Sequence, residues 1–530
     1  MSKIPSYIET DKLEEREYQV NIFKNIKEKD SLVVLPTGLG KTVIAVFLIC
    51  SKLESNKKVL MMAPTRPLCK QHLDFLLEST SLREKDAKLL TGELYSPEER
   101  KEIWKGQTKV FFATPQTVNN DLHEIPLSSI DLMVFDEVHR ATGDYAYVEI
   151  ARACKEKMQF LGLTASPGSS YEKLVEVGEN LEIEKIEVRK DTDNDVESYV
   201  SEEMIEWTEI KKSEELKTME KLSNSVLADF IEELEDYTKQ ARNLSTDEIG
   251  KSALIDIQEN LQNRINQENK GYLFHALSLT SASIKISHLK ELILTQGVDS
   301  AHRYYLKLLD DESRAAKYIV KKNEFDRLGE KLMDLKAIPV ETNPKLNNTK
   351  RILKDKLKDG NAIVFAQYRD TVDYLVEELE RVEGIFSSRL VGQTDREADE
   401  GMTQDEQRDI LEDFRNGKTN VLVSTSIGEE GLDIPSTELV IFYEAVPSAI
   451  RSIQRKGRTG RDGNIGKVHV LITKDSKDEA FYWKSQHEEK KMYDHVYELK
   501  KELEESDDPK NKILSLKMDS KPDQNKLDKF

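Results

Sequence analysis

Short apolar runs recur in two separate parts of the chain. The first part, from about residue 31 to 188, contains "SLVVL" (31–35), "KVLMMA" (58–63), "KVFFA" (109–113), "LMVF" (132–135) and "FLGLT" (160–164). The second part, from about 361 to 475, contains "NAIVFA", "SSRLV", "NVLVSTS", "LVIFY" and "KVHVLIT". Runs that are apolar throughout are typical of parallel strands covered on both faces. The pattern predicts two α/β domains with doubly wound parallel sheets.

A helical pattern fills the region between these parts. From about residue 189 to 340 apolar positions repeat with the 3.6-residue period of amphipathic helices, as in "SVLADFIEELEDYTKQARNL". The stretch "ETNPKLNNTK" (341–350) is interpreted as the linker that comes after it, and the charged end of the chain as disordered. The predicted domains are a first lobe (1–188), a helical insert (189–340), a second lobe (341–500) and a disordered tail (501–530).

Composition narrows the class of protein. The chain has 530 residues, of which 38% are hydrophobic and 34% charged, so it can form several cores with a very polar surface. No apolar run approaches the roughly 18 residues that span a bilayer, and the first residues contain no apolar signal region, so we expect an intracellular protein without a membrane partner. Cys50, Cys69 and Cys154 are expected to be reduced and buried. The net charge of −20 restricts any nucleic-acid binding to local patches.

The stretch "VVLPTGLGKTVIA" (33–45) is the strongest chemical signal. A strand is followed by a glycine-bearing turn that contains Thr37, and then by a helix start. Gly38 and Gly40 allow backbone N–H groups to surround phosphate oxygens. Lys41 is expected to reach the β and γ phosphates of ATP, and Thr42 to bind Mg²⁺. Leu35 stands where the stricter phosphate-loop pattern has its first glycine, a departure that leaves these contacts possible.

A pair of acids comes after a later apolar run, in "DEVHRATGDYAYVEIA" (136–151). Ligands of doubly wound sheets gather at the carboxyl ends of the strands. We therefore expect Asp136 to hold Mg²⁺ and Glu137 to orient and deprotonate the attacking water. Acidic pairs at strand ends are common, and it is the phosphate loop upstream that gives this pair its meaning. The tyrosines after it are expected to pack on the first lobe.

Eight motifs, in this order, resemble those of superfamily 2 helicases, which have two RecA-like lobes. They are "EREYQ" (15–19), the phosphate loop, "MAPTRPLCKQH" (62–72), "ATPQTVNNDL" (113–122), "DEVH", "LTASPG" (163–168), "STSIGEEGLDIP" (424–435) and "QRKGRTGR" (454–461). The stretches "IVFAQYRDT" (363–371) and "LVGQ" (390–393) resemble backbone-binding segments of the second lobe. The resemblance implies an ATP-dependent motor in which an arginine from one lobe completes the ATP site of the other.

The resemblance also assigns roles to single residues. It implies that Gln19 reads adenine, that Gly431 and Asp433 contact the nucleotide, and that Gln454, Arg458 and Arg461 face the γ-phosphate. It implies that Thr164 and Ser166 couple the state of ATP to the grip on the strand, and that His139 bridges to the second lobe, although a packed histidine is the alternative. The implied contacts to the nucleic-acid backbone are Thr65, Arg66, Thr114, Gln367, Gly392, Gln393 and Thr425.

A longer match is similar to one branch, the archaeal Hef and Fanconi anaemia group M translocase family. It rests on "DEVHRATGDYAYVEIA", the helical insert, "NPKL" and "VIFYEAVPSAIRSIQRKGRTGR". The resemblance implies branched DNA, such as stalled forks and Holliday junctions, as the substrate, and an archaeal-type cell with the protein in the cytoplasm at the nucleoid. The insert would act as a thumb on duplex DNA, or as a spacer or partner platform. Its cations Lys285, Lys290, Arg303, Lys307, Lys321 and Lys322 form either a basic face or an ordinary solvated surface.

Two features concern partners. Relatives of this branch often continue into a nuclease domain, but "ERKEIWK" (99–105) lacks the acid that a nuclease needs, so we expect no endonuclease activity here. A separate nuclease is a possible partner. The C-terminal "QNKLDKF" resembles a peptide that binds the sliding clamp PCNA, with Gln524, Leu527 and Phe530 as anchors. A random polar tail is the alternative.

The sequence supports three functional hypotheses. The first is an ATP-driven motor that unwinds or branch-migrates DNA. The second is a duplex-RNA-directed member of superfamily 2, and the third is a clamp-tethered scaffold that uses ATP only as a switch. The presence of Lys41, Glu137, Arg458 and Arg461 argues against an inactive ATPase. The stretch "VPSAIRSIQRKGRTGR" favours DNA over RNA by resemblance.

Overall fold

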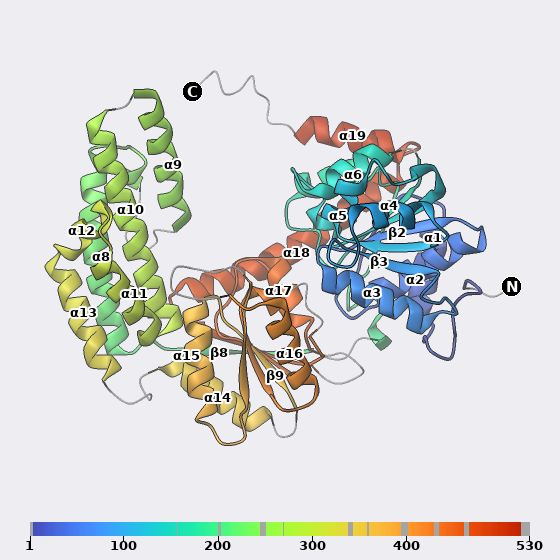
Figure 1. The fold of residues 1–530 in the computed structure, drawn as a ribbon. Helices are drawn as coiled ribbons and strands as arrows, with labels where there is room; N and C mark the ends of the chain where they lie inside the picture. The colour runs from blue at the N-terminus through green and yellow to red at the C-terminus, as the bar shows by residue number, and fades with distance from the viewer. Residues whose placement is uncertain are drawn as a thin grey trace.

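The computed structural model has three bodies: two α/β lobes and a helical bundle (Figure 1). It describes residues 4–155, 157–199, 203–243, 251–268, 270–337, 343–357, 360–393, 401–428, 434–459 and 466–520. The bundle lies at one side of the molecule and the first lobe at the other, with the second lobe between and below them in the view of Figure 1. The predicted fold class is therefore confirmed.

Lobe 1 is built on a seven-stranded parallel sheet. Its spatial order is β3-β4-β2-β5-β6-β1-β7. The strands are β1 (Ser31–Val34), β2 (Lys58–Met62), β3 (Ala87–Leu90), β4 (Val110–Ala113), β5 (Ile130–Asp136), β6 (Gln159–Thr164) and β7 (Lys185–Val188). The helices are α1 (Glu17–Ile26), α2 (Lys41–Glu54), α3 (Arg66–Ser79), α4 (Pro97–Lys105), α5 (Pro115–Asp121), α6 (Ala146–Cys154) and α7 (Tyr171–Asn180). Apolar residues of the strands are buried on both faces, as the continuous runs predicted.

Lobe 2 is built on a six-stranded parallel sheet of order β10-β11-β9-β12-β13-β8. The strands are β8 (Glu203–Ile210), β9 (Ala362–Phe365), β10 (Ser387–Leu390), β11 (Val421–Ser424), β12 (Leu439–Phe442) and β13 (Gly466–Thr473). The helices are α14 (Pro344–Lys356), α15 (Arg369–Glu380), α16 (Gln404–Arg415) and α17 (Ala449–Lys456). In chain order and in space, β8 to β13 occupy the places that β1 to β6 occupy in lobe 1.

Strand β8 corrects the predicted extent of the helical insert. The sequence placed residues 203–210 inside the insert, whereas the structure pairs β8 with β13 along its whole length as the edge of the second sheet. An edge strand is covered less completely, and Met204, Ile205 and Trp207 keep 48%, 41% and 54% of their surface exposed. Its sequence "EMIEWTEI" mixes acids with apolar residues, so the search for continuous apolar runs missed it.

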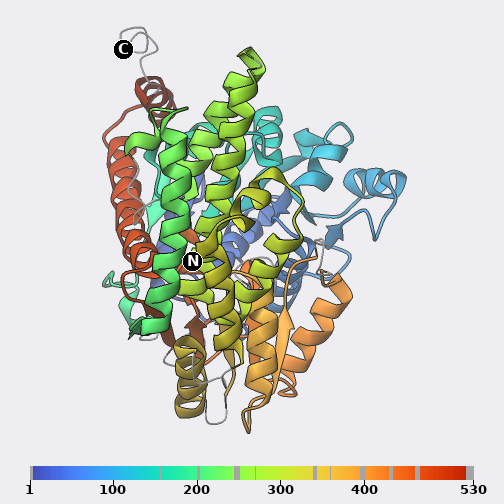
Figure 2. The ribbon, with the colours of Figure 1, turned by 90° about the vertical axis from the view of Figure 1, so that its left-hand side faces the viewer.

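The helical bundle comes after β8 and returns the chain to α14. It consists of α8 (Glu214–Glu235), α9 (Lys251–Glu268), α10 (Gly271–Glu291), α11 (Val298–Asp310), α12 (Arg314–Val320) and α13 (Asn323–Lys336). Its apolar stripes meet in a core of its own, separate from the cores of the sheets. A π-helical turn (Leu292–Gln296) continues α10 toward lobe 2. The long helices run nearly side by side in Figure 2.

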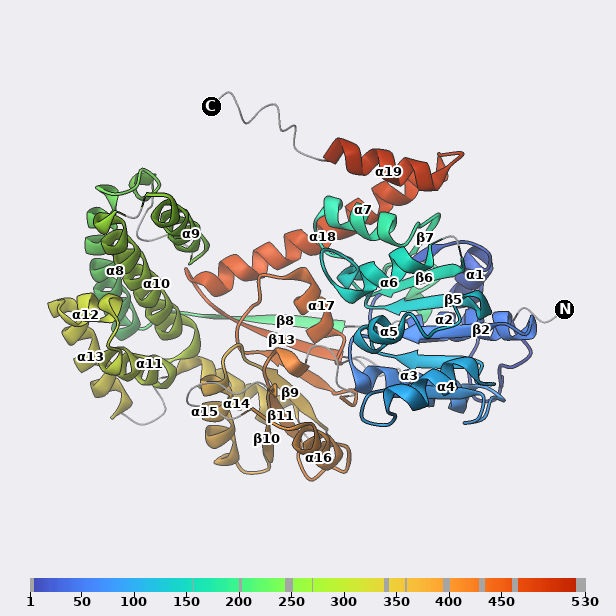
Figure 3. The same ribbon diagram turned by 45° about the horizontal axis from the view of Figure 1, so that its top comes forward.

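The C-terminal segment is helical, which corrects the prediction of a disordered tail for residues 501–520. Helix α18 (Lys477–Glu504) starts at lobe 2 and crosses to lobe 1, and α19 (Pro509–Ser520) lies against α7 (Figure 3). Ile513 of α19 is 1% exposed, and Lys510 donates to Asp30 at 2.8 Å. The tail looked disordered because its few apolar residues contact another domain rather than each other. Residues 521–530, with the predicted clamp peptide, lie outside the described residues.

None of the helices in the described residues combines the length and the apolar character required to cross a bilayer.

Candidate nucleotide site and nucleic-acid groove

The phosphate loop connects β1 to α2 at the carboxyl edge of the first sheet. Gly38 and Gly40 have φ values of 88° and 73°, the left-handed region that favours glycine. A Cβ on Gly40 would also lie 2.3 Å from Nε2 of Gln19, so α1 packs directly on the loop. Lys41 donates from Nζ to the carbonyl oxygens of Leu35 at 3.0 Å and Pro36 at 3.4 Å. The Lys41 ammonium group is therefore held by carbonyl groups of its own loop.

Gln19 is placed beside this loop with one open hydrogen-bonding position. Its Nε2 donates to the Leu39 carbonyl at 3.2 Å and to the Tyr18 hydroxyl at 3.4 Å. Its Oε1 is shielded from solvent and has no hydrogen-bond partner among the described residues. A buried acceptor without a partner is costly, and the exocyclic amine of adenine is a donor that would satisfy it. The residue therefore fits the predicted adenine contact.

The two acids stand at the end of β5, between β2 and β6. Asp136 is buried, and its Oδ2 lies 2.7 Å from Nε2 of His72 on α3. Burial alone would raise the pKa of the Asp136 carboxyl, but His72 and Lys41 lower it below its usual range, so the carboxylate form is favoured. An ionised carboxylate and the half-buried hydroxyl of Thr42 are oxygen donors of the kind that Mg²⁺ prefers.

Mg²⁺ would be held mainly through the phosphates of ATP and water. Among the described residues, no three side chains of His, Cys, Asp or Glu are grouped so that they could hold a metal by themselves. Mg²⁺ retains several waters and is commonly bound through one or two protein oxygens plus phosphates. The donors at this strand end therefore fit the ion without forming a complete cage.

Glu137 adopts a conformation that residues with a side chain rarely adopt. Its φ and ψ are 49° and 49°, in the left-handed region. Its Oε2 lies 3.3 Å from Nδ1 of His139, yet it is buried and makes no hydrogen bond of good geometry with the described residues. A carboxylate oxygen in this state is ready to accept a proton from a water molecule.

The three predicted coupling residues form one connected group. Nδ1 of His139 lies 3.1 Å from Oγ1 of Thr164, which accepts a hydrogen bond from the Ser166 amide at 3.1 Å. Thr164 and Ser166 are fully buried. Within the described residues, the hydrogen-bonding and ionic contacts of His139 are both in lobe 1, so the bridge to lobe 2 stays a prediction.

Lobe 2 meets the phosphate loop directly. A Cβ on Gly457 would lie 2.4 Å from Cβ of Thr37, so the turn after α17 lies against the loop. Gln454 and Arg458, on either side of this glycine, are 6% and 9% exposed. Ala165 of lobe 1, Ile453 of α17 and Met492 of α18 form an apolar contact nearby. Gly431, Asp433 and Arg461, the other predicted contacts, lie outside the described residues.

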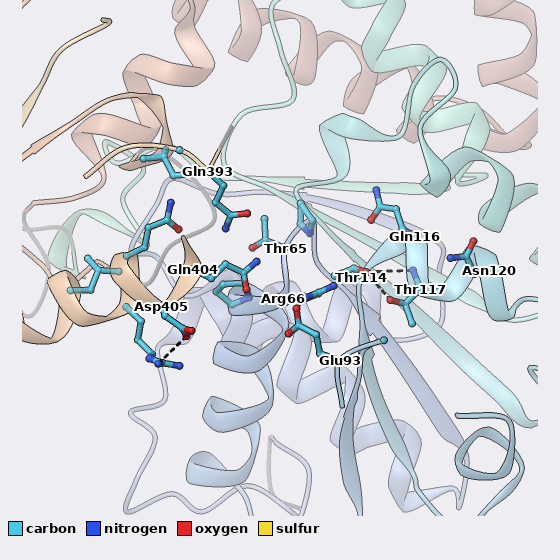
Figure 4. A pocket seen from close by; sticks show the side chains of 18 of the residues that line it. Thr65, Arg66, Glu93, Thr114, Gln116, Thr117, Asn120, Gln393, Gln404 and Asp405 are labelled. Atoms are coloured by element: carbon cyan, nitrogen blue, oxygen red, sulfur yellow. Dashed lines mark hydrogen bonds and ion pairs between the residues drawn. The ribbon is translucent and has the colours of Figure 1, made fainter. Parts of the chain in front are cut away.

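A groove of about 1050 Å³ lies between the lobes, next to the carboxyl ends of β2, β4 and β10 (Figure 4). Five of the predicted nucleic-acid contacts line it, namely Thr65, Arg66, Thr114, Gly392 and Gln393. Thr65 and Thr114 cap α3 and α5 by accepting from backbone N–H groups, which orients both helix starts toward the groove. Gln367 is exposed after β9 and Thr425 is buried after β11, and neither lines the groove.

The groove also contains residues that the motifs did not indicate. From lobe 1 these include Glu93, which pairs with Arg66, and from lobe 2 the α16 residues Gln404 and Arg408. Arg408 pairs with Asp405 at 3.0 Å. Arg369 on α15 donates to the Gly392 carbonyl at 2.8 Å and so supports the groove wall. The stretch "TQDEQR" (403–408) could have predicted the start of α16, because Thr403 and Glu406 form a capping box, and it places Arg408 in the first turns of that helix.

The bundle does not present the predicted cations as a free basic face. Lys285, Lys307 and Lys322 form ion pairs with Asp311, Asp370 and Asp229. These contacts reduce the positive potential that a phosphate would meet. For these three of the six predicted cations, the structure supports the alternative of an ordinary solvated surface.

A buried polar cluster joins the bundle to lobe 2. Glu444, two residues after β12, is 2% exposed, and its Oε2 accepts from Nε2 of Gln296 in the π-helical turn at 3.3 Å. Arg455 of α17 is fully buried and lies over the rings of Phe365 and Phe442. Burial raises the pKa of Glu444 to about 7, although Arg455 and Lys345 act in the opposite direction. Sequence reasoning missed this cluster because its members are far apart along the chain.

Three family models match the chain. Residues 12–169 match the model described as the type III restriction enzyme, res subunit. Residues 344–463 match the helicase conserved C-terminal domain. Residues 215–338 match the helical bundle of a putative ATP-dependent RNA helicase. The three matches correspond to lobe 1, lobe 2 and the bundle.

Similar proteins are found in archaea and fungi. The crystal structure of the Pyrococcus furiosus Hef helicase domain is 39% identical with a TM-score of 0.68, and the match covers 91% of this chain and all of that one. A putative ATP-dependent RNA helicase of Methanocaldococcus jannaschii is 40% identical over 91% of this chain and 60% of its own length. The ATP-dependent DNA helicase mph1 of Neurospora crassa is 34% identical over 88% and 41%. The chain thus spans about half the length of the curated relatives it matches.

Proposed function

The chain belongs to the superfamily 2 helicases of the Hef type, and from this premise we propose that it is an ATP-driven motor that remodels branched DNA. One observation carries the proposal. The turn after α17 of lobe 2 lies against Thr37 of the phosphate loop in lobe 1, with Arg458 beside it. An ATP site shared by two lobes makes hydrolysis depend on how the lobes are placed.

The chain's own residues divide the work at this site. Gln19 holds the adenine, the backbone of Gly38 and Gly40 holds the phosphates, and Lys41 leaves its loop carbonyls for the phosphate oxygens. Glu137 accepts the proton of the attacking water. Gln454, Arg458 and, outside the described residues, Arg461 stabilise charge on the γ-phosphate, while Gly431 and Asp433 contact the nucleotide. Mg²⁺ next to Thr42 and Asp136 supplies the positive charge that phosphoryl transfer requires.

The motor moves along nucleic acid because the nucleic-acid strand is bound between the same two lobes that share the ATP site. The groove is lined by Thr65, Arg66 and Thr114 on one side and by Gly392 and Gln393 on the other. A strand held at both walls is displaced when the lobes change their separation. His139, Thr164 and Ser166 connect the acid pair to β6 and report the state of ATP to this surface. Gln367 and Thr425 are proposed to join the contact in the DNA-bound form.

Branched DNA is proposed as the substrate because similar proteins are named as Hef and as DNA helicases. Duplex RNA is the second candidate. The M. jannaschii relative and the family model of the bundle both carry RNA helicase in their names. A clamp-tethered scaffold with ATP as a switch is the third, and it requires binding without multiple turnovers.

One experiment separates these candidates. ATP hydrolysis and strand displacement are measured with forked DNA, a Holliday junction, linear duplex DNA and duplex RNA of equal length. We expect the forked and four-way substrates to stimulate hydrolysis most and to be displaced or migrated. Stimulation by duplex RNA alone would reject the DNA motor. Tight binding to forks with fewer than one ATP hydrolysed per bound chain would favour the scaffold.

Two variants control the experiment. Lys41→Ala is expected to bind forked DNA and to hydrolyse no ATP above background. A Glu93→Gln variant leaves the ATP site intact and removes one negative charge from the groove, so it should bind DNA more tightly with unchanged basal hydrolysis. If Glu93→Gln and wild type bind forked DNA with equal affinity, the groove is not the DNA path.

The C-terminal peptide is proposed to bind the sliding clamp, which would hold this motor at the replication fork in the cytoplasm. A separate nuclease would act on the products, since we propose no nuclease activity for this chain. The test compares clamp binding by the full chain and by Phe530→Ala. Equal binding by both would remove Gln524, Leu527 and Phe530 from the function.

A further inference from the structure

Two buried side chains hold the strand end that carries Asp136 and Glu137. Tyr147, fully buried at the start of α6, donates from its hydroxyl to the Asp136 carbonyl oxygen at 2.8 Å. His72, buried on α3, places Nε2 at 2.7 Å from Oδ2 of Asp136. We propose that His72 and Tyr147 are positioning residues that fix the orientation of the Asp136 and Glu137 carboxylates. Nucleic acid bound in the groove changes this orientation through them. The proposal rests on the function proposed above.

The hydrogen bond from the Tyr147 hydroxyl acts on the peptide bond just before Glu137. The Asp136 carbonyl belongs to the peptide bond that joins Asp136 to Glu137. The next residue, Glu137, is held in the left-handed region at φ 49°, which is unfavourable for a residue with a Cβ. A rotation of this peptide would relieve Glu137 and turn its carboxylate away from the γ-phosphate. The Tyr147 hydrogen bond opposes that rotation.

The surroundings fix the Tyr147 hydroxyl in place. Its ring packs edge-on against Phe135 at 5.2 Å, and the Tyr145 ring packs against it at the same distance. The hydroxyl also lies 3.4 Å from the Met62 carbonyl at the end of β2. Val138, the third residue of the box, is buried on Gly162 of β6, where a Cβ would lie within 3.0 Å of it. The strand end is therefore held from both neighbouring strands and from α6.

His72 connects the same strand end to the groove through one rigid helix. α3 begins at Arg66 after its cap Thr65, and both residues line the groove. His72 stands seven residues after the cap, about 10 Å along the helix axis. A nucleic-acid backbone that draws the start of α3 toward it moves the His72 ring with it. The Asp136 carboxylate moves too because it is bound to that ring.

Tyr147 has a corresponding connection through α5. Helix α5 begins after Thr114, and its residues Gln116, Thr117 and Asn120 line the groove. Helix α6 packs along α5, and Asn119 Nδ2 of α5 donates to Glu149 Oε2 of α6 at 2.7 Å. His72 thus belongs to a helix that lines the groove, and Tyr147 belongs to a helix that packs against one that does. We attribute the stimulation of ATP hydrolysis by nucleic acid to the connection from α3 to His72 and to the connection from α5 through α6 to Tyr147.

The test uses Tyr147→Phe, which removes the hydroxyl and retains the ring. We expect kcat with saturating forked DNA to fall about tenfold, with KM for ATP and DNA affinity within about twofold of wild type. Stimulation by DNA should fall by the same factor. Tyr145→Phe is the matched control, because the half-buried Tyr145 hydroxyl makes no hydrogen bond within the described residues, and it should behave as wild type.

A second measurement needs no turnover. The Arg140 and Ala141 amides donate to the Glu137 and Val138 carbonyls at 3.1 and 2.8 Å. We expect Tyr147→Phe and His72→Leu to raise hydrogen exchange of these amides about tenfold. His72→Gln keeps an N–H donor and should restore both exchange and kcat toward wild type.

The outcomes separate this inference from the proposed function. A wild-type chain without hydrolysis stimulated by nucleic acid would contradict the function, and exchange in the ligand-free variants would still test the positioning roles. An active wild type with unchanged kcat and exchange in Tyr147→Phe would overturn the inference alone. A rise in exchange throughout lobe 1, or a rise in KM equal to the fall in kcat, would also overturn it, because either result means general loosening.

Discussion

The six strands of lobe 2 match β1 to β6 of lobe 1, and the lobes differ in the segment that connects the first of these strands to the second. In lobe 1 the connection from β1 to β2 is the phosphate loop and α2, whereas in lobe 2 the connection from β8 to β9 is the bundle and α14. The connection that forms the phosphate loop in lobe 1 is the connection into which the helical bundle is inserted in lobe 2. Equal topology therefore left the loops free to acquire different roles.

The fourth strand in each sheet extends this comparison to single residues. By register, Phe135 of β5 corresponds to Phe442 of β12, so Glu137 corresponds to Glu444. Oε2 of Glu137 lies 3.3 Å from Nδ1 of His139, whereas Oε2 of Glu444 accepts from Gln296 and burial raises the pKa of Glu444 to about 7. We expect the neighbours of each carboxylate, rather than its position on the strand, to decide whether it takes part in catalysis.

The largest expected effect comes from the lobe 2 residue at the shared site. Arg458→Ala should lower ATP hydrolysis by about 10³-fold, because an arginine across the cleft stabilises charge that develops on the γ-phosphate. ATP binding, measured with a fluorescent nucleotide, should change little. Arg458→Lys keeps the charge without the forked geometry and should recover only part of the rate. Full activity in Arg458→Ala would show that lobe 2 does not complete the site.

The paired acids give the next test. Glu137→Gln should lower kcat on the order of 10²-fold by removing the proton acceptor, and should trap ATP with DNA. Glu444→Gln, at the corresponding position of lobe 2, should stay within about threefold of wild type, a change below about 1 kcal/mol. Steady-state ATPase rates measure both variants. Similar losses in the two variants would contradict the division between a catalytic and a structural carboxylate.

Stability against pH tests the buried carboxyl of Glu444. A carboxyl whose folded pKa is raised stabilises the fold fully below its unfolded pKa, and that contribution is lost as pH rises through the folded value. Wild type should therefore lose up to about 3 kcal/mol relative to Glu444→Gln as pH rises from the usual carboxyl pKa of 4.5 to the folded pKa of about 7, with little further change above it. Urea unfolding at several pH values measures the difference. A constant difference across this range would show that Glu444 stays ionised in the folded chain.

The smallest effect concerns α19, which lies against α7 of lobe 1 and has no counterpart packed on lobe 2 among the described residues. Ile513 is 1% exposed against α7, whereas Leu514, next to it on the same helix, is 42% exposed. Ile513→Ala should weaken the docking of α19 by about 2 kcal/mol, and Leu514→Ala by a few tenths. Limited proteolysis between α18 and α19 reports the loss. Equal cleavage of the two variants would mean that the helix is not held by this side chain.

Much of the fold could be predicted from local signals. The apolar runs are confirmed as parallel strands because a strand buried on both faces has no polar positions to interrupt the pattern. The phosphate loop was visible because glycine is required at Gly38 and Gly40 by backbone conformation alone. Family membership is confirmed as well. The predicted domain limits stay predictions, apart from the corrected positions of β8 and the C-terminal helices.

The missed features depend on contacts between distant segments. His72 and Tyr147 lie inside the quoted motifs "MAPTRPLCKQH" and "DEVHRATGDYAYVEIA", but the motifs gave neither residue a role of its own, and that role appears only when α3 and α6 meet at the end of β5. Glu444 resembles an ordinary surface acid until Gln296 and Arg455 close over it. The aromatic stretch after the acid box was expected to serve packing, and for the Tyr145 ring the structure shows only that.

The entry of the chain through β8 and its exit through α14 place both ends of the bundle in lobe 2. The bundle is therefore carried by lobe 2, and lobe 1 is the frame against which both move. α10, with 21 residues, makes the bundle an arm of about 30 Å. A rotation of lobe 2 by about 10° would sweep the far end of such an arm through roughly 5 Å. One closure of the ATP site would thereby be amplified into a stroke comparable to the spacing of a nucleotide along DNA.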